Sequence, residues 1–135
     1  MKRFMILIGL VLIIVGLFAQ EPEGTQPEGA GTALSPYQIA TWLNLLWISQ
    51  HSEAWNKHFI QTENIEFPQS GENDIHHWIE NTGWIPIGDF EIGSFTGKYN
   101  GNNKTIRGLY INRPRVDGQA LIGATSTGAE IKNVF

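Results

Sequence analysis

The sequence predicts a mainly β domain that opens with one short α-helix, and three observations lead to this fold class. From Gly83 onward, glycine recurs between apolar stretches that are too short for helices, a pattern typical of short strands and tight turns. Residues 105–110 are matched in type at five of six positions by residues 130–135, which lie 25 positions further on. A repeat of strand-length units at this spacing indicates a β-solenoid, with a simple hairpin pair as the alternative. Residues 42–49 carry apolar side chains at the spacing of one helix face.

Residues 1–19 are predicted to be a secretory signal peptide. Two basic residues precede an unbroken run of apolar residues and glycine from Phe4 to Phe18, and the small residue Ala19 marks the cleavage point. A run of this length suits a signal peptide, whereas a bilayer span needs about 20 residues. An uncleaved membrane anchor is the alternative, because Leu17 is larger than the residue usual at that position. We therefore expect a protein that is secreted or lies at the cell surface.

Charge and cysteine content narrow the function classes. The formal net charge is -4, and it becomes -6 once residues 1–19 are removed with their two basic residues. A mildly acidic chain argues against a nucleic-acid partner, which needs clustered basic side chains. The chain contains no cysteine, so neither disulfides nor an N-terminal lipid anchor is available. Contact with a membrane is expected only in transit, through the signal peptide.

Residues 20–34 are predicted to form a flexible tether. They consist mainly of Gln, Glu, Pro, Gly, Thr and Ala, without an apolar period. Such a segment cannot bury enough apolar surface to offset the entropy of ordering it. Residues 35–135 then form one domain of ordinary size with a moderate core.

The first part of this domain predicts a strand, a helix and a second strand. Residues 36–40 alternate as a short strand does, with proline at its beginning. Thr41 is the expected N-cap of the helix, because its hydroxyl can accept a hydrogen bond from the first turn. A helix this short is unstable alone and is expected to be a lid over a core. Residues 59–67 alternate again, and the polar residues 68–82 follow as a loop.

Several motifs after the loop resemble those of a known family. They are GWIPIG at 83–88, FTGKYNG at 95–101 and ALIG at 120–123. These stretches resemble bacterial secreted proteins that carry GLUG repeats, and the similarity extends over residues 31–135. The resemblance implies a right-handed parallel β-helix, of which this chain holds an N-terminal cap with one short helix and the first coils. It also implies an adhesin-like or stalk protein on the cell surface, with no enzymatic activity in this segment.

Some positions depart from the family pattern. Ala120 and Ile122 stand where the named repeat has a glycine and an aromatic residue, so this copy is expected to stack more loosely. Asn64 and Glu66 replace two aspartates, which removes a cation site there. Because the family also occurs beside peptidase domains, the alternative is the leading segment of a longer exported peptidase or polysaccharide-cleaving enzyme.

Asparagines are predicted to shape the turns. Asn100-Gly101 is a tight-turn signal, since both residues tolerate positive φ. Asn102, Asn103 and Asn133 are predicted to form side-chain amide ladders between coils. The sequence ends in the middle of a repeat, at Phe135. We therefore predict a truncated β-helix whose uncapped last coil self-associates, with surface glycans or proteins as the other expected partners.

No catalytic residue, cofactor or metal site is expected. His76 and His77 are adjacent, so on an extended chain they point to opposite faces and cannot easily bind one ion. His51 and His58 are separated by Ser52, where the helix is expected to break. The carboxylates weighed for sugar cleavage are the neighbouring pairs Glu63 with Glu66 and Asp89 with Glu91. Pairs this close in sequence are usually solvated, so catalysis is not expected.

Trp78 and Trp84 are the candidate glycan-contact residues. Carbohydrate-binding surfaces use exposed aromatic platforms, and Trp78 lies in the polar loop where packing explains it least. A carbohydrate-binding module is therefore an alternative function, on the condition that Trp78 is exposed beside Trp84. The other interpretation is that Trp78 closes the loop onto the core, and that Trp84 and Tyr99 are packing residues that cover the ends of the apolar stack.

Overall fold

A computed structural model describes residues 21–135, so the predicted signal peptide lies outside the described residues. The described chain is mainly strand with one short helix, which confirms the coarse fold class. One parallel sheet contains β1 (Tyr37–Ile39), β2 (His58–Gln61), β4 (Lys98–Lys104) and β6 (Glu130–Val134), and a second contains β3 (Ile65–Glu66) and β5 (Ile106–Arg107). Within residues 21–135, no helix has both the length and the apolar character needed to cross a membrane.

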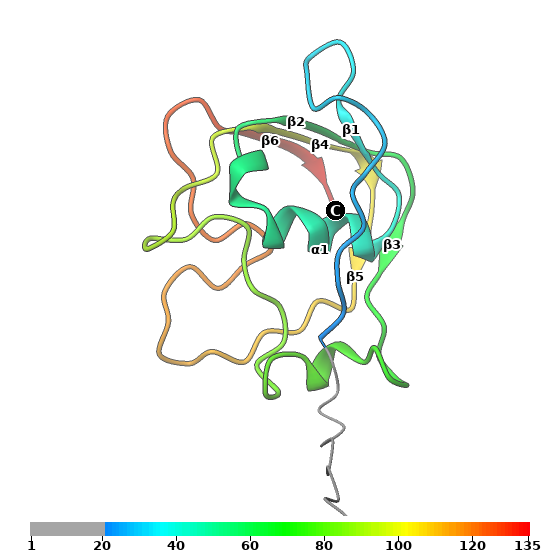
Figure 1. The fold of residues 1–135 in the computed structure, drawn as a ribbon, viewed down its shortest axis with the longest axis vertical. Helices are drawn as coiled ribbons and strands as arrows, with labels where there is room; N and C mark the ends of the chain where they lie inside the picture. The colour runs from blue at the N-terminus through cyan, green and yellow to red at the C-terminus, as the bar shows by residue number, and fades with distance from the viewer. Residues whose placement is uncertain (1–20) are drawn as a thin grey trace, which may run out of the picture.

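The larger sheet is built by repeated parallel returns of the chain. Its strands lie in chain order, β1-β2-β4-β6, and Figure 1 shows β2, β4 and β6 running together along one side of the molecule. The register places Tyr37 beside Phe59, Phe59 beside Tyr99, and Tyr99 beside Ile131. We call these four residues the inner column. Two isolated parallel bridges continue the pattern in the loops, Ile87 with Ile122 and Phe95 with Thr125.

Helix α1 (Trp42–Gln50) closes one end of the core. Thr41 is its N-cap, as predicted, and Thr41 Oγ1 accepts a hydrogen bond from the backbone N of Asn44 at 3.3 Å. The Asn44 side chain accepts in return from the backbone N of Thr41 at 3.1 Å. Leu45 and Ile48 are fully buried, so the helix is the lid that the sequence predicts. A 3₁₀ turn, η1 (Ser52–Ala54), then leads into β2.

Residues 21–34 differ from the predicted flexible tether, because the structure places them against α1. The carbonyl of Thr25 accepts a hydrogen bond from Asn44 Nδ2 at 3.0 Å, and the backbone N of Gly24 donates to Gln50 Oε1 at 2.8 Å. Figure 1 shows this segment crossing the helix. The polar side chains of α1 satisfy the backbone groups of the segment, so it docks without an apolar period of its own.

The same segment covers the outer edge of β1. The backbone N of Gln38 donates to the carbonyl of Glu28 at 2.8 Å, and the two residues form an antiparallel bridge. An uncovered edge strand presents unpaired backbone groups to other chains. The β1 end of the sheet is therefore closed, by Glu28 at the edge and by α1 over the core.

The predicted strand 59–67 is divided by a corner into β2 and β3. Phe59 and Gln61 before the corner, and Ile65 and Phe67 after it, are all buried, so the predicted alternation holds on both sides. Gln61 is fully buried, and its Nε2 donates to the carbonyls of Glu63 at 2.9 Å and Thr105 at 3.0 Å. Its Oε1 accepts from the hydroxyl of Tyr99 at 3.2 Å. The buried amide thus satisfies backbone carbonyls at the corner, as buried polar groups require.

Aromatic side chains fill the centre of the core. Among residues 21–135, the fully buried aromatic residues are Trp84, Tyr99, Phe59, Phe67 and Phe95. Burial raises the pKa of Tyr99 well above its usual range, because the phenolate would lose its hydration. Trp84 and Tyr99 are packing residues, in agreement with the core interpretation, but they lie within the core rather than at its ends.

The sequence repeat does not set the pairing of the strands. Ile106, in the first copy, pairs with Ile65 of β3, whereas Ile131, in the second copy, pairs with Tyr99 of β4. Paired residues in β4 and β6, such as Lys98 and Glu130, are 32 residues apart rather than 25. The two similar stretches therefore occupy different sheets.

Candidate functional site

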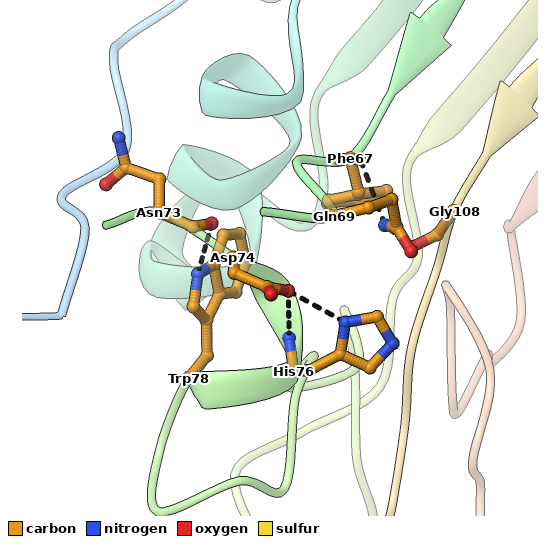
Figure 2. A network of polar contacts seen from close by, with 7 residues as sticks. All are labelled: Phe67, Gln69, Asn73, Asp74, His76, Trp78 and Gly108. Carbon is orange, nitrogen blue, oxygen red and sulfur yellow. Dashed lines mark hydrogen bonds and ion pairs between the residues drawn. The ribbon is translucent and has the colours of Figure 1, made fainter. Parts of the chain in front are cut away.

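Trp78 does not form an exposed platform. It follows the 3₁₀ turn η2 (Ile75–His77), and only 4% of its surface is exposed. Its ring centroid lies 5.4 Å from that of Trp42 and 6.1 Å from that of Phe67. Its indole Nε1 donates to the carbonyl of Asn73 at 2.9 Å, which Figure 2 shows. Trp78 closes the loop onto the core, and the condition for its glycan contact is not met.

Trp84 is also enclosed. It has no exposed surface, its ring lies 5.3 Å from that of Phe67, and its Nε1 donates to the carbonyl of Leu121 at 3.2 Å. Both tryptophans pack against Phe67 with edge-on ring geometry, in the core rather than on a surface. Neither residue is placed to stack on a sugar from solvent.

A polar cluster surrounds the 3₁₀ turn η2, and Figure 2 shows its members. Asp74 is the N-cap, and its Oδ1 accepts from the backbone N of His76 at 3.0 Å and contacts His76 Nδ1 at 2.7 Å. Hydrogen bonds from the backbone and then the ring of His76 lower the pKa of Asp74 below its usual value. The His76 ring lies 4.4 Å from that of Tyr110. Asp74 and His76 therefore fasten the loop to the neighbouring segment.

We expect the stability of the protein to depend on Asp74 in acid. The pKa of Asp74 is lower in the folded state than in the unfolded state. The ionised Asp74 therefore stabilises the fold above its unfolded pKa of about 3.9, and this stabilisation is lost as the pH falls through its folded pKa. The melting temperature of the parent should fall more steeply below about pH 4 than that of Asp74→Asn. Thermal melts at stepped pH measure this, with Glu53→Gln, an exposed carboxyl in η1, as the control. Parallel curves for the parent and Asp74→Asn would contradict the assignment.

The other polar residues considered from the sequence are not brought together into a site. His51 Nδ1 lies 2.8 Å from the carbonyl oxygen of Trp47, and the His51 ring stacks on the Trp47 ring. His58 is the first residue of β2. Asp89 Oδ1 accepts from the backbone N of Glu91 at 2.8 Å, so it shapes its own turn. Among residues 21–135, no three His, Asp or Glu side chains are grouped closely enough to hold a metal ion.

The β6 end of the sheet is open, in contrast to the β1 end. Phe59 and Tyr99 of the inner column are 2% and 1% exposed, but Ile131 is 44% exposed, and Phe135 beyond it is 68% exposed. Among the described residues, β6 pairs with β4 alone, so its outer edge is unpaired. We call this end, formed by β6 and Phe135, the open edge. An apolar core end beside an unpaired strand is a surface on which another strand can add.

The side of the larger sheet that faces solvent carries a second feature, which sequence inspection missed. Its residues are His58 and Ile60 of β2, Lys98 and Asn100 of β4, and Glu130 and Lys132 of β6. We call this set the outer face. Alternation in the strands could have revealed it, because these residues alternate along β2, β4 and β6 with Phe59, Tyr99 and Ile131 of the inner column. The signal was hidden by the long loops between the strands.

Comparison with known proteins gives a limited likeness. No family model matches the chain, and no solved structure matches it. The chain is similar to halomucin of Haloquadratum walsbyi, with 29% identity over 107 residues. The matched region is 79% of this chain but only 1% of halomucin, so the chain spans about one hundredth of the length of that relative. The resemblance to GLUG-repeat proteins stays a prediction.

Proposed function

We propose that this chain is an exported, non-enzymatic segment of an adhesin-like or stalk protein, built as the cap and first coils of a right-handed parallel β-helix. The observation that carries the proposal is the inner column, in which Tyr37, Phe59, Tyr99 and Ile131 stack in chain order across parallel strands. The second parallel pair, β3 with β5, repeats the arrangement on another side of the core. A chain that returns in parallel with the same residues aligned is typical of a solenoid, in which each unit buries its apolar face against a neighbour.

The two ends of the sheet support a role as a stalk. The β1 end is closed by residues 21–34 and α1, as the terminal cap of a solenoid must be to keep it soluble. The open edge presents Ile131 and Phe135 to the next layer. A protein of this shape extends in one direction only, away from its cap.

Two features support a place outside the cell. Residues 1–19 have the charge and apolar pattern of a signal peptide, which would direct export. The similar protein, halomucin, is named as a mucin. Secretion or attachment at the cell surface fits both.

The alternative of a carbohydrate-binding module with exposed tryptophans receives no support from the geometry. Trp78 and Trp84 are 4% and 0% exposed, and their indole N–H groups are already bonded within the protein. Any ligand of this segment would have to contact other residues.

The proposal is tested by the association of the purified chain. We expect dimers or larger species that increase with concentration, because the open edge of one copy offers a strand and an apolar end to another. Ile131→Lys should abolish the association, since it places a charge where the next layer would stack. Size-exclusion chromatography with light scattering measures this over a range of concentrations.

A matched control separates stacking from general stickiness. Ile92 is 67% exposed in a loop away from the strands, so Ile92→Lys adds the same charge elsewhere and should leave association unchanged. A parent chain that stays monomeric at every concentration and melts cooperatively would overturn the proposal.

A further inference from the structure

The outer face forms two rows of side chains across three strands. In the first row the register aligns His58, Lys98 and Glu130, and in the second it aligns Ile60, Asn100 and Lys132. Neighbouring strands lie about 4.8 Å apart, and the two rows lie about 7 Å apart along each strand. The face is therefore a small grid, long enough in the direction across the strands to follow an extended polymer.

A groove of about 380 Å³ runs over this grid. Ala33 and Pro36, from the loop before β1, form one wall, and Figure 1 shows that loop standing out beyond the strands. Ile60 and Pro36 form an apolar part of the groove surface, on which the C–H faces of sugar rings can pack. Asn100 Oδ1 accepts from Asn102 N and Asn133 Nδ2. Its Nδ2 donates to no group among residues 21–135, so it is available to a ligand.

The charge of the groove opposes that of the rest of the chain. The protein has 13 acidic residues against 9 basic ones, yet the groove holds two lysines and a histidine around a single carboxylate. Lys132 Nζ lies 2.7 Å and Lys98 Nζ 4.0 Å from Glu130, and Lys98 Nζ also donates to the carbonyl of Gly128 at 2.6 Å. Both lysine side chains are about half exposed, at 52% and 43%, and each ammonium group has three N–H donors, so donors remain for a ligand. The hydrogen bond and charge of Lys132, followed by the charges of Lys98 and His58, lower the pKa of Glu130. Glu130 is therefore ionised and offsets one of the two lysine charges, which leaves an excess of one positive charge among Lys98, Lys132 and Glu130.

From this geometry we infer that the outer face binds a linear acidic polysaccharide with one carboxylate on each sugar, a polyuronate, which crosses β2, β4 and β6. The inference rests on the proposed function for the export of the chain, and it names the class of ligand that such a surface segment would hold. Lys98 and Lys132 pair with successive carboxylates, Asn100 donates to ring or hydroxyl oxygens, and Ile60 packs on a ring face.

The small number of cationic side chains on the outer face favours a polyuronate over a nucleic acid as the ligand. A nucleic acid carries about one charge per 1.7 Å of duplex and is held through many phosphate contacts, which two lysines beside a carboxylate do not supply. A uronate polymer has fewer charges, which are separated by neutral hydroxyl-bearing rings. Its charge density along the chain matches two lysines on different strands.

The binding of alginate, a polyuronate, tests the inference in affinity electrophoresis and calorimetry at low salt with the full purified chain. We expect alginate to bind and its propylene glycol ester, in which the carboxylates are blocked, to bind far more weakly. The double variant Lys98→Gln/Lys132→Gln should bind alginate at least about tenfold more weakly than the parent, because both charge-assisted contacts are lost. Glu130→Gln should bind about threefold more tightly, because the repelling carboxylate is gone.

A second double variant controls for net charge. Arg107→Gln/Arg115→Gln removes two exposed cations outside the outer face and should change alginate binding by less than about twofold. Equal losses in the two double variants, equal binding of the ester, tighter binding of DNA, or no binding by the parent would each overturn the inference. The self-association test of the proposed function is independent of the alginate test. A chain that associates through the open edge but does not bind alginate would overturn only the inference about the polysaccharide.

Discussion

Replacing Trp84 with alanine is expected to lower the free energy of unfolding by about 3–5 kcal/mol, the usual cost of truncating a buried tryptophan. Trp84 has no exposed surface and packs against Phe67 with ring centroids 5.3 Å apart. Its removal opens a cavity between the Leu121 segment and the aromatic core, and the carbonyl of Leu121 loses its donor. Urea denaturation followed by circular dichroism measures the change.

Two further variants test whether burial is the cause. Trp84→Phe keeps an aromatic ring but loses the indole N–H, so we expect a smaller loss of about 1–3 kcal/mol. Ile92→Ala removes an apolar side chain that is 67% exposed and should change the stability by less than about 0.5 kcal/mol. A small loss in Trp84→Ala would contradict the placement of Trp84 in the core.

The Gly101→Val variant is expected to lose about 3 kcal/mol of stability, because the backbone of β6 leaves no room for a side chain at this glycine. A Cβ at Gly101 would lie only 2.2 Å from the carbonyl oxygen of Asn133 and 2.8 Å from the Cα of Val134. The obstructing atoms are backbone, so β6 must move away from β4. Hydrogen exchange of the β6 amides, with urea denaturation for the total loss, measures this movement.

The control for this variant lies in the same strand. Lys98 is on the outer face, its side chain is 43% exposed, and Lys98→Val introduces the same β-branched side chain. We expect its effect on stability to stay within about 0.5 kcal/mol. If valine were tolerated equally at positions 98 and 101, the close pairing of β4 with β6 would be wrong.

Local chemistry explains the elements that the sequence predicted well. The helix cap depends on residues only three positions apart, Thr41 and Asn44, so its signal is contained in one short stretch. The alternation of residues 59–67 likewise depends on which side of the chain faces the core. The corner after Gln61 interrupts the strand but preserves this alternation, since Ile65 and Phe67 remain buried.

Features that depend on distant partners could not be predicted in the same way. Asn100 and Gly101 lie within β4 and do not have positive φ. The residues with positive φ are Asn102 and Asn103, at 51° and 55°, where the register of β4 with β6 shifts. The tight contact with Asn133 explains why a glycine stands at 101. Nothing near Gly101 in the sequence reveals that contact.

The predicted asparagine ladder is present in part. Asn133 Nδ2 donates to Asn100 Oδ1 at 3.1 Å, whereas Asn102 Nδ2 donates to the carbonyl of Gln61 at 3.1 Å. Side-chain amides therefore do connect neighbouring strands. The sequence suggested which residue type does so, but the partners follow from a register that unequal loops conceal.

The candidate site was the hardest part to predict. Tryptophan in a polar loop suggested an exposed platform, but Trp78 reaches the core because Asp74 and His76 fold the loop back. The outer face is assembled from pairs such as Lys98 with Asn100 and Glu130 with Lys132. Each pair is unremarkable in its own strand, and the groove exists only once the strands are aligned.

The closed β1 end has a consequence for how the chain folds as it is made. Residues 21–50 are synthesised before the strands β2, β4 and β6 that follow them, and the parts of a chain made earlier generally fold first. Because α1 and Glu28 cover that end, each later strand finds one finished template and one direction in which to add. In a partly made chain the larger sheet then has one unpaired edge, at the strand made last, which limits the pairings by which this sheet could misassemble with neighbouring chains.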